Sequence, residues 1–361
     1  MNEIIPKSEL EIQSIELAET IPSKWYFDPF IFKTEQHQIF SETWQLVGSE
    51  SKIPNLGDTL ITEIGENPIL VSRQPEGKIK AFYNVCRHRG GPLLRKNACV
   101  KSFQCKYHGW VYNRDGTLRS TREFDGVENF DFENHGLVSI HLESWMGLIF
   151  VNLSESPKLL DHYLSGIKER LDPLDFTDYQ FHSRESYNIR CNWKVYLDNY
   201  LEGYHIPLVH PKLNTVVDYK SYKTELFEYY SLQSCPIDPE ISPYGKTELG
   251  TDLAYYFTIF PNILLNIAPG RLQTNIVEPT GPTSCVVHFD FYFENPNKTD
   301  LKSDFEFSEL VQQEDIQICE DVQRGLESKA YDKGRFSVQS EKGVHHFQSL
   351  LKQHFSSEYN G

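Results

Sequence analysis

The segment CRHRGGPLLRKNACVKSFQCKYHGW, residues 86–110, determines how the rest of the chain is interpreted. It contains two pairs of metal-binding side chains, Cys86 with His88 and Cys105 with His108, and sixteen residues separate the two pairs. Thiolates and imidazoles are ligands for zinc and for iron–sulfur clusters. The glycines near each pair allow the backbone to approach a bound group closely, and a proline stiffens the first loop. The segment therefore predicts two tight loops that hold one metal centre.

The spacing of these side chains separates two kinds of metal centre. A zinc finger usually has Cys–Cys and His–His pairs, each separated by about two to five residues. Two mixed Cys/His pairs instead fit a [2Fe–2S] cluster in which two cysteines hold one iron and two histidines hold the other. A zinc ribbon or scattered core residues is the alternative. The segment resembles the Rieske motif, which implies that Cys86, His88, Cys105 and His108 bind such a cluster.

The composition restricts the classes of function. With 361 residues, the chain is long enough for two domains with a substantial core. Its 35 basic and 51 acidic side chains give a formal charge of −16, which argues against nucleic acid or an anionic membrane as partner. Apolar runs are short and the first residues mix both signs of charge, so we expect a soluble, cytoplasmic protein. Seven cysteines are too few for a disulfide framework in this length.

The hydrophobic pattern changes twice along the chain. Residues 1–43 are expected to form a helical lead-in that packs on the C-terminal domain. Residues 44–152 alternate with a period of about two, which predicts a small antiparallel β domain that contains the cluster motif. Residues 153–361 contain an amphipathic helix at 156–171, several alternating strands and a long helix near 304–324. Strands wrapped on a long helix predict a helix-grip domain with a large antiparallel sheet, and the chain as a whole is predicted to be α+β.

A second group of candidate ligands lies in the segment NWKVYLDNYLEGYHIPLVHP. At helical spacing, Asp198, Glu202 and His205 share one polar face, and the two carboxylates are candidate catalytic residues. His210 lies five residues beyond His205. Pro207 between them should disrupt the helix and let the two histidines approach each other, where they could hold a divalent metal. An exposed polar face with a core histidine is the alternative.

A misplaced charge in the long helix near the C-terminus supplies a third candidate ligand. The predicted apolar stripe of this helix runs through Phe307, Val311, Ile318 and Val322, and Asp315 falls on it. A carboxylate that faces a core costs several kcal/mol unless it is paired or bound to a metal. Two histidines and one carboxylate are the ligand set of non-haem Fe(II) oxygenases. A buried aspartate paired with an arginine or with backbone amides is the alternative.

Over nearly its whole length the chain resembles the catalytic α-subunit of Rieske non-haem iron ring-hydroxylating oxygenases. The similar segments are WYFDPFIFKTEQHQIFSETWQLVG, the cluster motif, NWKVYLDNYLEGYHIPLVH, EDIQICEDVQRGL and GRFSVQSEKGVHHF. This resemblance implies that His205, His210 and Asp315 bind a mononuclear Fe(II), and that Glu202 links this iron to the cluster of a neighbouring subunit. Most members have Asp at that position. Glu there, with the segments DNYLEGYH and VQRGL, is similar to the branch that acts on choline, glycine betaine and carnitine.

The resemblance implies a terminal oxygenase that uses O2 and electrons from a separate NAD(P)H-dependent flavin and iron–sulfur reductase. No glycine-rich dinucleotide fingerprint follows a strand in the sequence, so the reductase sites are expected on another polypeptide. It also implies a homotrimer in which each cluster serves the neighbour's iron. We expect hydroxylation, or N-demethylation, of a small quaternary-ammonium substrate. An aromatic-ring-hydroxylating dioxygenase is the first alternative, and a Rieske electron carrier, which needs only residues 44–152, is the second.

Overall fold

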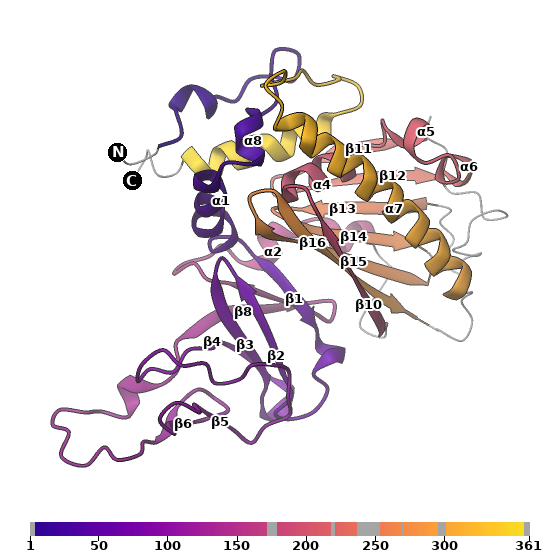
Figure 1. The fold of residues 1–361 in the computed structure, drawn as a ribbon. Coiled ribbons are helices and arrows are strands. Elements are labelled where there is room, and N and C mark those ends of the chain that lie inside the picture. Colours follow the sequence, from indigo (N-terminus) through magenta and orange to yellow (C-terminus); the bar gives the residue numbers. More distant parts are fainter. Residues whose placement is uncertain are drawn as a thin grey trace. The chain divides into compact units, whose positions relative to one another are not determined.

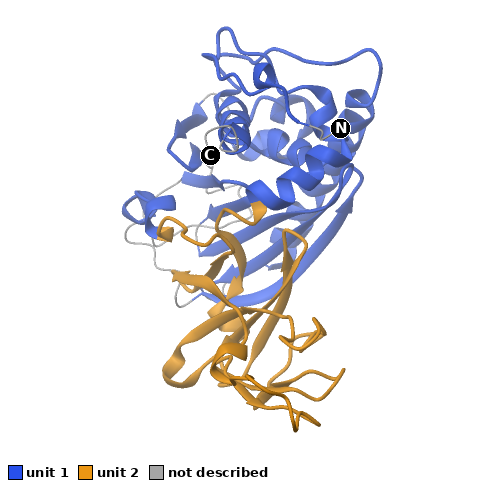
Figure 2. Ribbon diagram, turned by 90° about the vertical axis from the view of Figure 1, so that its left-hand side faces the viewer, with its two compact units in different colours: residues 1–39, 161–361 blue, residues 40–160 orange. Residues whose placement is uncertain are grey.

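The computed structural model describes residues 4–171, 179–217, 221–236, 253–268, 270–294 and 301–356. The chain divides into two compact units, Met1–Ile39 with Asp161–Gly361 and Phe40–Leu160 (Figure 2). Within the described ranges, no helix combines the length and the apolar character needed to cross a membrane.

The unit Phe40–Leu160 contains two antiparallel sheets. The larger has six strands in the order β1-β9-β8-β4-β3-β2, and the smaller has three in the order β5-β6-β7. Short 3-10 helices connect some of the strands: η4 (Glu50–Lys52), η5 (Pro75–Gly77) and η6 (Glu133–His135). The strands are β1 (Gln45–Ser49), β2 (Thr59–Ile64), β3 (Asn67–Arg73), β4 (Ile79–Tyr83), β5 (Ser102–Gln104), β6 (Val111–Asn113), β7 (Leu118–Ser120), β8 (Ser139–Trp145) and β9 (Leu148–Asn152).

The hairpin between β6 and β7 fixes the small sheet on the core of this unit. Asp115 Oδ1 accepts a hydrogen bond from Thr117 N over 3.0 Å, and Gly116 has a φ of +91°. A Cβ at Gly116 would lie 2.4 Å from the Phe82 ring, so only glycine fits this turn. The same core contains both cysteines of the cluster motif, with Phe82, Phe103, Trp110 and Tyr112. The two candidate cluster cysteines therefore belong to a packed apolar core.

The other unit is built on a seven-stranded antiparallel sheet in the order β10-β16-β15-β14-β13-β12-β11. The helix α7 crosses one face of this sheet, and α4 packs on α7 and on strands β15 and β16 (Figure 1). The strands are β10 (Gln180–Ile189), β11 (Lys223–Leu226), β12 (Tyr230–Pro236), β13 (Leu253–Ile259), β14 (Ile263–Ala268), β15 (Arg271–Gly281) and β16 (Ser284–Phe293). The α-helices, most of which belong to this unit, are α1 (Pro29–Glu35), α2 (Leu160–Tyr163), α3 (Ile167–Leu171), α4 (Trp193–Tyr200), α5 (Ile206–Val209), α6 (Leu213–Val216), α7 (Leu301–Leu326) and α8 (Lys342–Ser356). Two 3-10 helices, η1 (Lys7–Glu9) and η2 (Ser23–Tyr26), precede α1. The predicted α+β class with antiparallel sheets is confirmed.

Two helices differ from their predictions. The segment predicted as one helix at 156–171 forms the separate helices α2 and α3, because Gly166 adopts a φ of +85° that a helix cannot continue through. The helix α7 begins before residue 304 and ends after residue 324, so it is longer at both ends than its periodicity indicates.

A buried ion pair joins α1 to α4. The ammonium of Lys194 contacts the carboxylate of Glu35, and both side chains are 0% exposed. Trp193 Nε1 donates to the second oxygen of Glu35 over 2.8 Å. A buried charge that loses its partner destabilises a fold strongly, so this pair fixes the position of α4 relative to α1.

Candidate metal centres and pocket

Both loops of the cluster motif are closed by the same pair of backbone hydrogen bonds. In each loop the cysteine N–H donates to the carbonyl five residues later, and the cysteine carbonyl accepts from the N–H four residues later; all four bonds measure 2.9 Å. The residues four positions after Cys86 and Cys105 are Gly90 and Gly109, with φ of +72° and +80°. The repeated glycine therefore gives two loops of the same shape.

The histidine rings of the two loops lie against each other. The centroids of His88 and His108 are 4.7 Å apart, with the rings 72° from parallel. His88 also stacks on Trp110 at 4.8 Å and 9°. Its Nδ1 atom is buried and makes no hydrogen bond to any described residue. Because buried polar atoms normally have a partner, this orphan nitrogen fits a metal ligand, and the two thiols and two imidazoles fit a [2Fe–2S] cluster.

Tyr112 supports the first loop and was not predicted from the sequence. Its hydroxyl accepts from Arg87 N over 2.9 Å and lies 3.3 Å from Cys86 Sγ. Because the hydroxyl accepts the bond from Arg87, its own proton is available for the sulfur. Hydrogen bonds to cluster sulfurs are one of the factors that set reduction potentials, so Tyr112 can tune a bound cluster.

The segment that carries His205 and His210 is not one helix. The helix α4 ends at Tyr200, so the prediction of a continuous helical face as far as His205 is wrong beyond that residue. His205 precedes and His210 follows the short helix α5, and Pro207 lies in its first turn. A proline is tolerated there, whereas in a continuous helix its ring would meet the carbonyl four residues earlier. The break brings the two imidazole centroids to 5.0 Å from each other.

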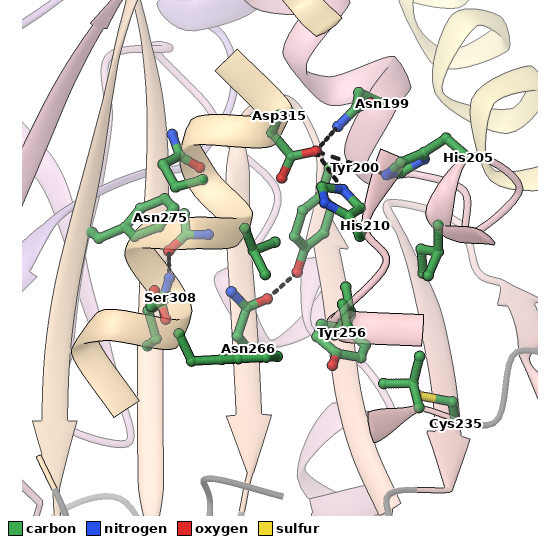
Figure 3. A pocket seen from close by; sticks show the side chains of 18 of the residues that line it. Asn199, Tyr200, His205, His210, Cys235, Tyr256, Asn266, Asn275, Ser308 and Asp315 are labelled. Carbon is green, nitrogen blue, oxygen red and sulfur yellow. Dashed lines mark hydrogen bonds and ion pairs between the residues drawn. The ribbon is translucent and has the colours of Figure 1, made fainter. Parts of the chain in front are cut away.

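Asp315 of α7 lies beside these two histidines (Figure 3). Its Oδ1 atom is 3.0 Å from His210 Nε2 and 3.7 Å from His205 Nε2. The same oxygen accepts a hydrogen bond from Asn199 Nδ2 over 2.6 Å. One ligand atom from Asp315 and from each histidine lies within 4.8 Å of the others. This geometry fits a divalent cation held by two histidines and one carboxylate.

The reason why Asp315 faces inward differs from the prediction. Val322, placed on the apolar stripe, is 43% exposed. The residues that α7 buries are Asp304, Gln312, Cys319, Gln323 and Leu326. Asp315 lies one turn from Gln312 and from Cys319, and 15% of its side chain is exposed. The buried row is therefore partly polar and turned slightly from the predicted stripe.

A glutamate carboxylate contacts the Nδ1 atom of each histidine, on the ring side away from Asp315. His205 Nδ1 is 2.7 Å from Glu202 Oε1, the contact expected from the sequence, and His210 Nδ1 is 2.7 Å from Glu314 Oε2. Burial opposes a charge on His210, but Asp315 and Glu314 outweigh it and raise its pKa. Carboxylate–histidine pairs of this kind orient imidazoles toward a metal. Glu314 was missed because helical periodicity places it off the predicted buried face.

A pocket lies next to the three candidate iron ligands, which are among the residues that line it. Six Tyr and Phe side chains contribute to its walls: Tyr196, Tyr200, Tyr222, Tyr256, Phe289 and Phe307. Its polar lining includes Asn199, Glu202, Asn266, Arg271, Gln273, Asn275, Ser308 and Gln312. The pocket can thus bind a small molecule that has both an apolar or cationic part and a polar part.

Comparison with known proteins identifies the family. Residues 176–357 match the ring hydroxylating alpha subunit (catalytic domain), and residues 43–131 match the Rieske [2Fe-2S] domain. The chain belongs to the Rieske non-haem iron oxygenases. The matched domains imply one [2Fe–2S] cluster and one mononuclear iron in this enzyme.

Choline and carnitine monooxygenases are among the relatives of this Rieske oxygenase. Choline monooxygenase from the chloroplast of Arabidopsis thaliana is 36% identical, over 93% of this chain and 83% of that protein. The carnitine monooxygenase oxygenase subunit of Escherichia coli (strain K12) is 32% identical, over 94% of each chain. A solved quaternary ammonium Rieske monooxygenase, studied for carnitine oxidation by gut microbiota and inter-subunit electron transfer, superposes with a TM-score of 0.86 at 28% identity. That superposition covers 98% of this chain and 99% of the other.

Asp198 lies in a network outside the residues that line the pocket. Tyr26 OH donates to Asp198 over 2.5 Å, and Gln348 Nε2 lies 3.3 Å from both carboxylate oxygens. Desolvation raises the pKa of Asp198 to about 7; the bonds from Tyr26 and Gln348 and the charge of Lys194 act against this rise, and Glu341 adds to it. The network connects α4 to η2 and α8. A catalytic role for Asp198 stays a prediction.

Substitution of single candidate ligands is expected to empty one metal site at a time. His205→Ala or His210→Ala should remove the mononuclear iron and keep the cluster, whereas Cys86→Ala or His108→Ala should remove the cluster. Iron and sulfide analysis with electron paramagnetic resonance of anaerobically purified protein measures both centres. An active preparation that holds zinc in place of the cluster would contradict the assignment.

Glu314→Gln is expected to lower the affinity for the mononuclear iron by about 10- to 100-fold, because the amide is a poorer partner for a metal-bound imidazole. Glu309→Gln, at an exposed position of the same helix, is the matched control. Equal iron affinity in the two variants, from anaerobic titration, would show that Glu314 does not support His210.

Asp198→Asn is expected to change how stability depends on pH. The carboxyl has a pKa of about 7 in the folded chain and about 3.9 in an unfolded chain. Its stabilisation is therefore complete below the unfolded value and is lost as the pH rises through the folded value. Asparagine does not titrate and undergoes no such loss. The melting temperature of the variant minus that of the unsubstituted protein should therefore increase between about pH 5 and pH 8. The exposed Asp161→Asn is the control, and a constant difference for Asp198→Asn would refute the assignment.

Proposed function

We propose that this chain is the terminal oxygenase of a system that oxidises a small quaternary-ammonium compound with O2 and electrons from a separate reductase. In this proposal one set of residues holds the cluster (Cys86, His88, Cys105 and His108) and another holds the iron (His205, His210 and Asp315). When bound, the cluster supplies single-electron transfer and the iron supplies reductive activation of O2. The residues of the chain bind the substrate, orient it and hold the ligands in place.

The aromatic and charged side chains that line the pocket are the main support for the proposed substrate class. Aromatic faces attract quaternary ammonium groups, and six Tyr and Phe side chains line this pocket. Glu202 and Asp315 add carboxylates at the metal end. Arg271, the one Lys or Arg among the lining residues that the structure describes, has its Nε 3.1 Å from Asp304 Oδ2. The cationic centre of a substrate therefore meets attractive charge near the metal ligands.

The proposed reaction is hydroxylation of a carbon next to the ammonium nitrogen. One oxygen atom of O2 enters a C–H bond and the other leaves as water, with two electrons from the reductase and two protons. The C–N bond of the resulting carbinol then breaks, its O–H proton is lost and the tertiary amine leaves. This releases formaldehyde when an N-methyl group was hydroxylated, or a larger aldehyde when another substituent was. The choline and carnitine monooxygenases support this substrate class by their similarity over nearly the whole chain.

Glu202 is the proposed link between the two metal centres. Its carboxylate contacts both the backbone N, over 3.1 Å, and Nδ1 of His205, and 12% of the side chain is exposed. Each carboxylate oxygen has a second lone pair, so Glu202 can also accept a hydrogen bond from a cluster histidine of a neighbouring subunit. A ring of identical subunits satisfies such a head-to-tail contact without open ends, and we propose a homotrimer.

Ligand binding tests the substrate class. Betaine, choline and carnitine analogues are expected to stimulate NAD(P)H-dependent O2 uptake with a surrogate reductase. Replacement of the ammonium nitrogen by carbon, as a tert-butyl group, should weaken binding by about 1–2 kcal/mol, the scale of a desolvated cation–π contact. Product mass identifies the oxidised carbon. Equal binding of the neutral analogue, or cis-diols from simple arenes, would favour the aromatic-ring dioxygenase.

Mixed rings test the route of the electrons. Co-expression of a cluster-deficient chain, His88→Ala, with an iron-deficient chain, His205→Ala, should restore activity that neither variant has alone. Glu202→Ala also loses the carboxylate that supports His205, so it is loaded with excess Fe(II). With both metal centres filled, it should still lose nearly all turnover, because the link is removed. Inactive mixed rings with verified assembly, or a monomer at working concentration, would exclude the inter-subunit route.

A further inference from the structure

Carboxamide side chains line the part of the pocket formed by β14, β15 and α7. Asn266 lies on β14, Gln273 and Asn275 lie on β15, and Gln312 lies on α7. Asn266 and Gln273 are directly opposite each other in the register of the two strands, and Asn275 is two residues further along. Residues two apart on a strand face the same side, so the three strand amides form one polar surface.

The orientation of Asn275 is set by a chain of hydrogen bonds that starts at Arg271. A guanidinium only donates, so the side-chain oxygen of Gln273 must face the Nη2 atom of Arg271. The Nε2 of Gln273 then donates to Asn275 Oδ1 over 2.7 Å. This uses the amide oxygen of Asn275 and leaves its NH2 group for the pocket. Asp304 balances the charge of Arg271 at the start of the chain.

The oxygens of the other two amides are also occupied. Tyr200 OH donates to Asn266 Oδ1, and Tyr196 OH donates to Gln312 Oε1, the latter over 2.7 Å. Gln312 is 2% exposed, and its Nε2 is a buried donor without a partner among the described residues. In Figure 3 the amide nitrogens of Asn266 and Asn275 point into the space between these two side chains. This side of the pocket therefore offers N–H donors whose own oxygens are taken.

We propose that Asn266, Asn275 and Gln312 form a subsite that binds an acceptor oxygen of the substrate. The inference rests on the proposed function and narrows its substrate to betaine-type compounds, in which a carboxylate or carbonyl oxygen is linked to the quaternary ammonium. Buried donors without a partner are costly, and an acceptor oxygen removes this cost. An alcohol matches the subsite less well, because its oxygen is a weaker acceptor than a carboxylate and each amide oxygen already accepts one hydrogen bond. Gln273 is a positioning residue that acts through Asn275.

Two ligands of the same shape separate this subsite from general affinity for ammonium. Glycine betaine carries the acceptor oxygens, and in isobutyltrimethylammonium two methyl groups on a CH carbon take the place of the two carboxylate oxygens. Calorimetric titration of the iron-loaded enzyme without reductase measures both affinities in the absence of turnover. The unsubstituted enzyme should bind glycine betaine at least tenfold more tightly than the oxygen-free ligand.

Substitutions assign the preference to the amides. Asn275→Leu removes the donor without adding charge, and Asn275→Asp removes it while adding one. Each variant should lower the affinity for glycine betaine at least tenfold. The affinity for isobutyltrimethylammonium should stay within about twofold or increase. Gln273→Met should reduce the ratio of the two affinities at least threefold, because it frees the amide of Asn275 to turn. Asn188→Asp, at an exposed position of β10, is the control for added charge and should change neither affinity.

Three outcomes would overturn the inference. Equal affinity of the unsubstituted enzyme for the two ligands would overturn the subsite and leave the proposed function intact. Asn275→Leu could instead lose affinity for both ligands while its iron content and circular dichroism are unchanged. That result would show that Asn275 has a general role in the pocket, and it would likewise exclude the subsite. Binding of neither ligand by the unsubstituted enzyme would overturn the proposed function, and the subsite with it.

Discussion

The contact between Asp315 and the two histidines is the constraint on which the catalytic unit depends. A carboxylate oxygen of α7 lies 3.0 Å from His210 Nε2, although the two residues are 105 positions apart in the chain. Together with Glu202 and Glu314, these side chains are three carboxylates and two imidazoles. They can share such a space only if charge is balanced, by protons or by a divalent cation. The packing of α4 on α7 brings these groups together. The same packing places Asn199 of α4 against Asp315, so the helix contact and the candidate iron site form one structure.

Contacts at both ends of α4 restrain the loop that carries His205. The buried pair of Lys194 and Glu35 holds the start of α4. At its end, a Cβ on Gly343 of α8 would lie 2.5 Å from the carbonyl oxygen of Leu201, so backbone meets backbone there. Such close approach is available to glycine alone. Rigid support on both sides keeps His205 and Glu202 in register, which matters because small displacements of ligands cost metal affinity.

The pocket combines two kinds of surface on a single scaffold. Carboxylates lie at the metal end, Tyr and Phe side chains line the walls, and amides whose oxygens accept hydrogen bonds lie on the strands β14 and β15. The buried ion pair of Arg271 and Asp304 explains how an amide surface can be oriented without a net charge. A dipolar ligand gains from both surfaces, since its cation and its acceptor oxygen meet different partners. Electrostatic selection and hydrogen-bond selection thus act together within one cavity.

The sequence by itself determined the cluster motif, the α+β class and the three candidate iron ligands. The motif is readable because cysteine, histidine and glycine lie within five residues of one another and the loop hydrogen bonds close locally. Asp315 was found through a misplaced charge, although α7 buries a different row of residues. Only the tertiary structure decided the break after Tyr200, the support of His210 by Glu314 and the alignment of Asn266 with Gln273. These depend on helix rotation and strand register, which long-range packing sets and which no local pattern of residues encodes.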